Sequence, residues 1–410
     1  MYMNSICLNF RVHLPYYYKR YNFFDIGINH DYYDTLQCEH EVKRASERCY
    51  IPANNLMMTL IERYPERFSF SLAISGTALE LFADYAPEVL DSFRNLVSTG
   101  RVELLATPYY HSLASLQSSD EFKYQVNLHR EKMKELFGVE PKTFANTEMV
   151  YADYIGVILS EMGFKGVLTE GAKHVLGWRS PNYVYSNPAA QNLKILFRNQ
   201  NMSDDIALRF TNSYWTGYPL TAEKFTDWIM RDPNHRCITL AMDYRVIGDY
   251  MDRSSGIFNF FEYFPEKILK YTDFHFRTPN MIFSKMNSVS PVYIPHEISW
   301  LSAERDITAW IGNDLQKDFF KKLFSVEEAI KKTGDTRLIT DWRRLQAVDN
   351  LYNMNMRWLN EDYLESNVSP YDVFVDNMNI FADIEIRMQQ HKFLKMASTR
   401  HKRSKEVAWG

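Results

Sequence analysis

The sequence of 410 residues contains few cysteines and no long apolar run. Its four cysteines, Cys7, Cys38, Cys49 and Cys237, show neither a C-x-x-C pair nor a spacing suited to zinc. Such isolated residues are typical of reduced thiols and favour a cytoplasmic protein. The sequence also lacks a basic N-terminal segment followed by an apolar stretch, and no run reaches the roughly eighteen apolar residues of a membrane span. We therefore expect neither secretion nor a membrane partner.

The chain has no strong excess of either charge. It carries 47 Lys and Arg against 51 Asp and Glu, a formal net charge of −4, and its pI is about 6.3. No global positive field would attract phosphate backbones, which disfavours a nucleic-acid partner. The one basic run, residues 391–405, lies at the end of the chain and is expected to be a solvated, partly disordered tail.

Aromatic residues, in contrast, are abundant. The chain has 27 Tyr, 27 Phe and 8 Trp, together 15% of its residues. Surplus rings commonly line clefts, and the C–H faces of sugars stack on them. An aromatic-rich core explains the same composition, so the two interpretations stay open at this point.

Short β-rich runs alternate with helical patterns over the first two thirds of the chain. The helical patterns include residues 86–98, with five apolar residues on one face, and residues 119–137. The seven predicted strands are residues 5–12, 68–74, 102–106, 142–145, 166–169, 193–197 and 237–242. This alternation predicts an α/β fold, a seven-stranded (β/α) relative of the eight-stranded TIM barrel.

The pattern changes after about residue 300 to helical stretches without strand runs. These stretches are residues 303–322, 342–358 and 370–390. We therefore predict two domains, a catalytic barrel over residues 1–300 and an α-helical domain with a basic tail over residues 301–410.

Polar residues follow most of the predicted strands. These residues are His13, His111, Glu148, Glu170, Arg198 and Asp243. Barrels of this type build their sites where the strands end, so we expect these side chains to converge on one rim.

Glu148 and Asp243 are the two carboxylates of most chemical interest. Retaining glycosidases use such a pair about 5 Å apart, one attacking the anomeric carbon and one protonating the leaving oxygen. Each residue could instead cap a helix or pair with an arginine, and spacing alone favours that structural role. If they form a catalytic pair, their carboxyl groups should face one cleft at about 5 to 7 Å.

Five short blocks occur in a characteristic order. They are Arg11-Val12-His13-Leu14-Pro15, Gly100-Arg101-Val102-Glu103-Leu104-Leu105, Asn146-Thr147-Glu148, Met242-Asp243-Tyr244 with Gly248, and Leu345-Gln346-Ala347-Val348-Asp349. In residue type and order they resemble the five signature regions of glycoside hydrolase family 57. Together with similar segments between them, the resemblance covers nearly the whole chain. It implies a seven-stranded barrel with a helical bundle, and a retaining hydrolase or transglycosylase for α-glucans such as starch or glycogen. No metal or organic cofactor is implied.

The resemblance assigns the nucleophile to Glu148 and the proton donor to Asp243. The candidate substrate-binding residues are His13, Glu103, His111, Trp178, Arg245, Trp300 and Asp349. His13 and His111 suit hydrogen bonds to sugar hydroxyls. Glu103 fits a structural partner as well as a substrate ligand, and Trp178 fits a packed core indole as well as a stacking platform.

Four departures from the family pattern bear on activity. Leu14 replaces the usual Gln, Leu301-Ser302 replaces Ala-Asp, and Asn350 replaces a histidine. Arg245 replaces a Glu two residues after the presumed acid, where its cation would favour an ionised Asp243 or bind an anionic sugar. The departures fit altered specificity, and they also fit weakened catalysis.

Two other functions compete with the enzyme hypothesis. The first is a carbohydrate-binding or regulatory protein that kept the fold and lost turnover. The second, a polysaccharide deacetylase, would need an Asp/His/His metal set, which His129 and His174 do not supply with convincing spacing.

Overall fold

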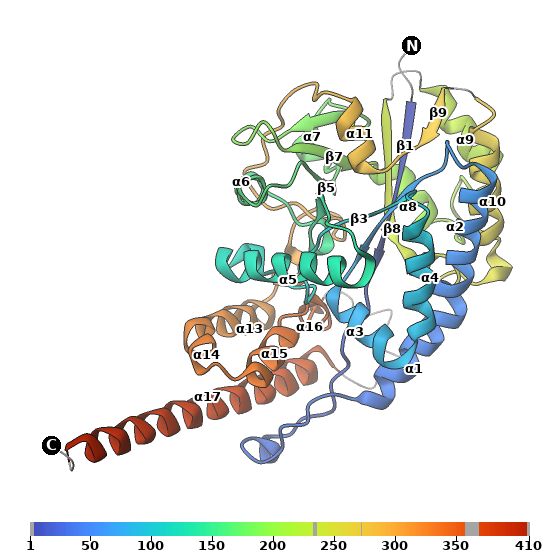
Figure 1. Cartoon of the computed structure of the whole chain (residues 1–410). Helices are drawn as coiled ribbons and strands as arrows, with labels where there is room; N and C mark the ends of the chain where they lie inside the picture. The colour runs from blue at the N-terminus through green and yellow to red at the C-terminus, as the bar shows by residue number, and fades with distance from the viewer. Residues whose placement is uncertain (1–3, 233–235, 272, 357–368, 408–410) are drawn as a thin grey trace. The chain divides into compact units, whose positions relative to one another are not determined.

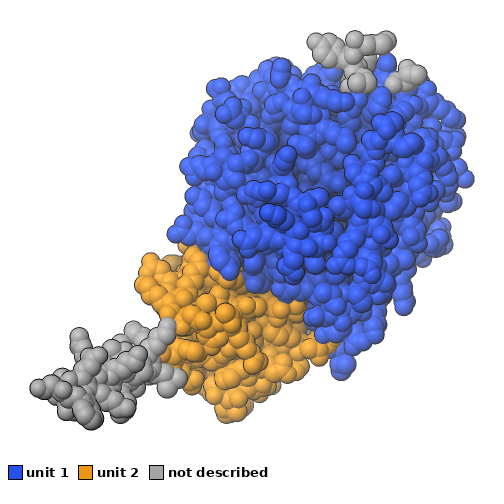
Figure 2. All heavy atoms as spheres, in the orientation of Figure 1, with its two compact units in different colours: residues 1–14, 36–111, 119–307 blue, residues 15–35, 112–118, 308–410 orange. Residues whose placement is uncertain are grey.

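The computed structural model describes the backbone of residues 4–232, 236–271, 273–356 and 369–407, and side chains as far as residue 391. Contacts divide the chain into two compact units (Figure 2). Unit 1 comprises residues 1–14, 36–111 and 119–307, and unit 2 comprises residues 15–35, 112–118 and 308–410. The predicted boundary at residue 300 lies close to the last of these divisions, whereas the two short segments grouped with the C-terminal residues were not anticipated.

Unit 1 is built on seven parallel strands (Figure 1). The strands are β1 (Asn4–Val12), β2 (Phe70–Ile74), β3 (Val102–Leu104), β4 (Thr143–Ala145), β5 (Gly166–Glu170), β7 (Lys194–Arg198) and β8 (Cys237–Asp243). They are ordered β3-β2-β1-β8-β7-β5-β4. Ala106, just beyond β3, pairs with β4 through two backbone hydrogen bonds of 2.9 Å and nearly closes the ring. The predicted seven-stranded (β/α) barrel is confirmed.

Two further strands were not predicted. β6 (Val184–Ser186) pairs antiparallel with β7, and β9 (Phe274–Phe276) pairs with the start of β1. Each has only three residues.

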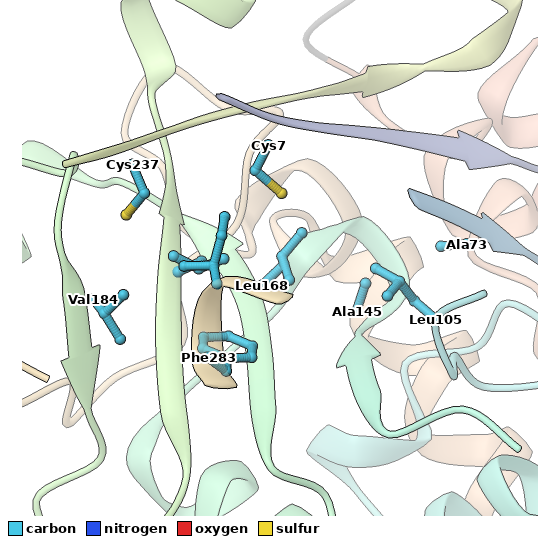
Figure 3. Close-up of a cluster of buried hydrophobic side chains, with 10 residues drawn as sticks. Cys7, Ala73, Leu105, Ala145, Leu168, Val184, Cys237 and Phe283 are labelled. Carbon is cyan, nitrogen blue, oxygen red and sulfur yellow. The ribbon is translucent and has the colours of Figure 1, made fainter. Parts of the chain in front are cut away.

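Apolar strand residues fill the barrel. Every residue of β8 is buried, as expected for a parallel strand covered on both faces. Figure 3 shows a cluster of such side chains, among them Cys7, Cys237, Leu105 and Leu168, contributed by several strands around the ring. All four cysteines of the chain are buried.

Helices connect and cover the strands of unit 1. They are α1 (Thr35–Ala45), α2 (Ile51–Arg63), α3 (Gly76–Tyr85), α4 (Pro87–Ser98), α5 (Ser119–Phe137), α6 (Asp153–Glu161), α7 (Lys173–Leu176), α8 (Gln200–Ala207), α9 (Ala222–Arg231), α10 (Ile257–Ile268) and α11 (Pro279–Lys285). Helices α9, α10, α2 and α4 stand side by side outside the strands (Figure 1). The helix predicted over residues 119–137 is confirmed as α5, and α4 buries the five apolar residues of the predicted face.

Unit 2 is helical in its C-terminal part, as predicted. Its helices are α12 (Thr308–Ile311), α13 (Asp314–Ser325), α14 (Glu327–Thr333), α15 (Thr336–Leu345), α16 (Val348–Tyr352) and α17 (Pro370–Val407). The single helix predicted over residues 342–358 is interrupted between α15 and α16, and its last two residues lie outside the described ones. The basic run lies in the final part of α17.

A buried carboxylate explains why residues 15–35 group with the C-terminal helices. Asp383 of α17 is fully buried, and it accepts hydrogen bonds from the backbone of Gly27 at 2.6 Å and from Tyr32. Gly27 bonds to Oδ1, whereas Oδ2 accepts from Tyr32 and also lies 2.8 Å from His30 Nδ1. Within the described residues, no helix combines the length and apolar character needed to cross a membrane.

The packing of β5 gives a first testable prediction. A Cβ added to Gly166 would lie 1.9 Å from the ring of Phe283. Gly166→Ala is therefore expected to lower the free energy of unfolding by about 1 to 3 kcal/mol through overpacking. Denaturant titration should show this loss and its partial recovery in Gly166→Ala/Phe283→Leu; an equally stable single variant would contradict the packing.

Candidate active site

One guanidinium joins the two carboxylates singled out in the sequence. Arg11, near the end of β1, pairs through Nη1 with Glu148 Oε1. Its Nη2 and Nε donate to Asp243 Oδ2 at 2.7 and 3.1 Å. Glu148 and Asp243, which follow or end different strands of the barrel, therefore face the same cation within unit 1.

Glu148 is held in an unusual backbone conformation. It lies in the 3-10 turn η4 (Thr147–Met149) directly after β4, with φ of 52°, and the next residue, Met149, has φ of 53°. This left-handed region costs a non-glycine residue about 1 to 2 kcal/mol. Neighbouring side chains hold the turn, because Ser299 donates to the Glu148 carbonyl at 2.8 Å and Thr169 donates to the Met149 carbonyl at 2.9 Å.

The carboxylate of Glu148 is buried and surrounded by donors. His111 Nε2 lies 3.0 Å from Oε1, and Trp300 Nε1 donates to Oε2 at 2.6 Å. Burial raises the pKa of Glu148, but the charge of Arg11 and the bonds from His111 and Trp300 lower it further, to about 2. Glu148 is therefore ionised at neutral pH.

Two histidines from different strand ends stack beside this carboxylate. The rings of His13 and His111 lie 3.8 Å apart at 25°, and His13 Nδ1 is 2.8 Å from Ser75 Oγ. Burial and the neighbouring His13 lower the pKa of His111 to about 4. At neutral pH His111 is thus uncharged, and its Nε2 hydrogen can be donated to Glu148. Its backbone is also left-handed, with φ of 51°.

Asp243 is the last residue of β8. Besides the contact with Arg11, its Oδ1 accepts from the backbone N of Arg245 at 2.9 Å, which caps the 3-10 turn η5 (Tyr244–Val246). Helix capping and arginine pairing, the two structural alternatives considered for these carboxylates, thus both occur at Asp243.

The side chain of Arg245 has its own partners. Its Nε donates to Asp249 at 2.9 Å, and its guanidinium lies over the Tyr250 ring at 4.6 Å. The cation that touches both carboxylates is Arg11, which sequence reasoning did not select. The signal was present, because Asn9, Arg11 and His13 are polar residues at alternate positions of an otherwise apolar strand.

Trp300 links this cluster to a second buried ion network. Its ring lies 4.9 Å from the guanidinium of Arg11 and 5.5 Å from that of Arg198. Arg198 pairs with Glu170 at 3.0 Å and with Asp204 at 2.5 Å. Asp204 also binds Arg305 at 2.7 Å, which ties down the segment that carries Trp300.

The other predicted binding residues make contacts of their own. Glu103 Oε2 accepts from the backbone of Asn280 at 2.8 Å, at the start of α11. Trp178 is 89% exposed beside Arg179, so its interpretation as a packed core indole is wrong. Asp349 and Asn350 belong to α16 in unit 2, where Asn350 donates to the Leu345 carbonyl at 3.1 Å.

A small cavity lies beside Glu148. In the cavity lined by Arg11, His111, Glu148 and Trp300, the centre of a water molecule can occupy a volume of about 20 Å³. This is room for about one water molecule. The described residues contain no group of three or more His, Cys, Asp or Glu that could hold a metal ion. His129, weighed for a deacetylase site, is buried and bonds through Nε2 to the Ile74 carbonyl at 2.7 Å.

A family model decides the identity of this barrel. The model for glycosyl hydrolase family 57 matches residues 7–295, which include both carboxylates and Arg11. The chain belongs to glycosyl hydrolase family 57. The glycoside hydrolase class expected from the sequence is therefore confirmed.

Family 57 relatives are similar in sequence and in fold. A protein of Methanocaldococcus jannaschii named "Putative alpha-amylase" is 35% identical over 402 residues, covering 94% of this chain and 85% of the relative. The family 57 branching enzyme of Pyrococcus horikoshii has a TM-score of 0.66 at 12% identity, over 95% of this chain and 88% of that one. An α-amylase of Thermotoga maritima has a TM-score of 0.63 at 11% identity, over 95% and 96%.

The bridging role of Arg11 generates a stability prediction. Arg11→Gln leaves two buried carboxylates without their shared cation and should lower the free energy of unfolding at pH 7 by about 3 kcal/mol. Because the pKa of Glu148 is lowered from 4.5 to about 2, its ionised carboxylate stabilises the fold above about pH 4.5. That stabilisation is lost as the pH falls toward 2, so the difference in unfolding free energy between wild type and variant should shrink over this range. Denaturant unfolding at neutral and acidic pH measures it.

Arg101→Gln is a matched control for this experiment. Arg101 pairs with the exposed Glu66, and its loss should cost less than about 1 kcal/mol. If Arg11→Gln were as stable as the wild type at every pH, the ion bridge would contribute nothing to the folded state.

Buried neutral histidines give a separate pH dependence. The pKa values of His111 and His129 are both lowered to about 4, chiefly by burial, from an ordinary value of 6.5. Between these values the unfolded chain binds more protons, so each histidine should reduce stability by about 1.4 kcal/mol per unit of falling pH. His129→Gln should remove one such contribution from the measured slope; an unchanged slope would show that His129 does not titrate there.

Proposed function

We propose that this chain is a retaining glycoside hydrolase or transglycosylase for α-glucans, with Glu148 as nucleophile and Asp243 as general acid and base. The observation that carries the proposal is the convergence of both carboxylates on Arg11 at the strand ends of a family 57 barrel. The shared guanidinium places both carboxylates at one site, as a glycosidase mechanism with two carboxylates requires.

The proposed reaction has two displacements. In the first, a Glu148 oxygen bonds to the anomeric carbon while Asp243 gives its proton to the glycosidic oxygen, and the leaving sugar departs. In the second, Asp243 takes a proton from water or from an acceptor hydroxyl, whose oxygen attacks the anomeric carbon and releases Glu148. Water gives hydrolysis, and a sugar hydroxyl gives transfer.

The environment of Glu148 supports the nucleophilic role. Its low pKa keeps the carboxylate ionised, and the hydrogen bonds from His111 and Trp300 fix its orientation. His111 and Glu148 both have left-handed backbone conformations. These conformations place the imidazole and the carboxylate in positions that a relaxed backbone would not give them.

Arg11 has to move for this cycle to run. A proton on Asp243 competes with the N–H groups of Arg11 for the same oxygen lone pairs. We therefore propose that bound substrate displaces the guanidinium from the two carboxylates, which frees Asp243 to carry its proton.

The α-glucan class rests on the relatives. Their names describe an α-amylase, a branching enzyme and, in a Thermococcus litoralis structure, a 4-α-glucanotransferase. His13, His111 and Trp300 supply polar and aromatic groups for the reacting sugar beside the carboxylates. Trp178, as an exposed indole, remains a candidate for stacking on a more distant sugar. For Asp349 a binding role stays a prediction from the sequence.

Arg11 also favours a second candidate function. A cation locked onto both carboxylates would leave a carbohydrate-binding or regulatory protein with little turnover. The two candidates differ in one measurable property, which is the release or transfer of sugar from an α-glucan.

An activity assay tests the leading proposal. The purified chain is incubated with maltooligosaccharides or glycogen, and products are followed by chromatography and reducing-sugar assay. We expect Glu148→Gln to reduce turnover by at least about a thousandfold, because it removes the nucleophilic charge and keeps the shape. Asp243→Asn should also be severely impaired.

Glu121→Gln is the matched control, because Glu121 is a buried carboxylate on α5 that bonds to Gln125 at 3.1 Å. It should keep wild-type turnover. Full activity in Glu148→Gln would refute the mechanism, whereas a wild type that binds glycogen without turnover would establish the binding-protein alternative.

A further inference from the structure

A second hollow lies in unit 1 between α8, residues 208–221 and α9. It is lined by Asn201, Asp205, Arg209, Trp215, Thr216 and Trp228. The volume open to the centre of a water molecule is about 540 Å³ there, against about 20 Å³ in the cavity beside Glu148. The hollow therefore has room for a ligand in the structure as it stands.

Two tryptophans form its aromatic wall. The rings of Trp215 and Trp228 lie 5.9 Å apart at 79°, and neither residue is fully buried. Trp215 lies against Gly217, where an added Cβ would be 2.5 Å from the indole. Lys224 donates to the Gly217 carbonyl at 2.9 Å and so fastens the segment that presents Trp215.

A paired cation and carboxylate form the polar edge. Arg209 Nε donates to Asp205 at 2.7 Å, its Nη2 donates to the Asn201 carbonyl at 2.9 Å, and its guanidinium lies 5.7 Å from the Trp215 ring. The preceding residue, Asp204, joins the ion network with Arg198 and Arg305. Neighbouring faces of α8 thus contribute to the network beside Trp300 and to the hollow.

This combination of groups matches a neutral sugar. Indole faces accept the C–H face of a pyranose, while a carboxylate and a guanidinium side by side bind neighbouring hydroxyls as acceptor and donor. Lys224 Nζ, 6.0 Å from the centre of the Trp228 ring, adds a cation beside the Asp205–Arg209 pair. This charged edge makes the hollow a poor match for a purely apolar ligand.

We propose that this hollow is a second, non-catalytic binding site for α-glucan chains. It holds a long polymer on the enzyme while another part of the chain reacts at Glu148 and Asp243. The glucan class of this ligand rests on the proposed function, whereas the site itself rests on Trp215, Trp228 and the Asp205–Arg209 pair.

Two readouts on the full chain separate the two sites. Mobility in native gels that contain glycogen reports binding, and turnover of glycogen against maltotriose reports use of the polymer. Trp215→Ala should lower the affinity for glycogen by about tenfold, which corresponds to about 1.4 kcal/mol of stacking. The same variant should raise KM for glycogen and leave kcat on maltotriose within about twofold of wild type.

Control variants keep the test decisive. Tyr263→Ala, which removes another exposed aromatic ring on α10, should behave as wild type. If Trp215→Ala fails to fold by thermal melting, Asp205→Ala replaces it and should weaken glycogen retardation about threefold, because it removes one hydrogen-bond acceptor.

The outcomes distinguish this proposal from the proposed function. Retardation that depends on Trp215 and persists in inactive Glu148→Gln supports the second site. The same retardation in a wild type without turnover supports the site and refutes the enzyme function. Retardation unaffected by Trp215→Ala and Asp205→Ala, or absent from the wild type, overturns the second site and leaves the catalytic proposal standing.

Discussion

The active-site region depends on one guanidinium between two carboxylates. Glu148 and Asp243 lie close together in a buried site, where two negative charges repel each other strongly. Arg11 removes that repulsion by pairing with both. The barrel order makes this possible, because β1 lies beside β8 and so brings Arg11 next to Asp243, its register partner. Ala106 nearly closes the ring by pairing with β4, the strand before Glu148, and so brings β4 into the same barrel.

The same site concentrates backbone strain. His111, Glu148 and Met149 all have φ between 51° and 53°, a region that non-glycine residues seldom occupy. Hydrogen bonds from Ser299 and Thr169 hold the turn that carries Glu148, and the Glu170–Arg198–Asp204–Arg305 network holds the segment that carries Trp300. The rest of the barrel therefore holds a few residues in backbone conformations that these residue types disfavour.

The sequence predicted the barrel well because buried parallel strands appear as short apolar runs. Residues 166–169 became β5 with one added residue, and all seven predicted strands exist. Residues 15–35 could not be assigned to the C-terminal unit, since their link to Asp383 spans more than 350 positions. Glu148 and Asp243 were found through motifs. The alternation of Asn9, Arg11 and His13 indicated that Arg11 shares a face with these polar residues, but its pairing with Asp243 is set by strand register, which no local pattern encodes.

Covalent trapping tests the central claim most directly. A fluorinated α-glucosyl fluoride slows the second displacement of a retaining enzyme, so the glycosyl group accumulates on the nucleophile. After proteolysis and mass spectrometry, we predict that the peptide containing Glu148 carries the mass of one fluoroglucosyl group and that Glu148→Gln carries none. A label on any other carboxylate, or no label in an enzyme that turns over α-glucans, would contradict the account.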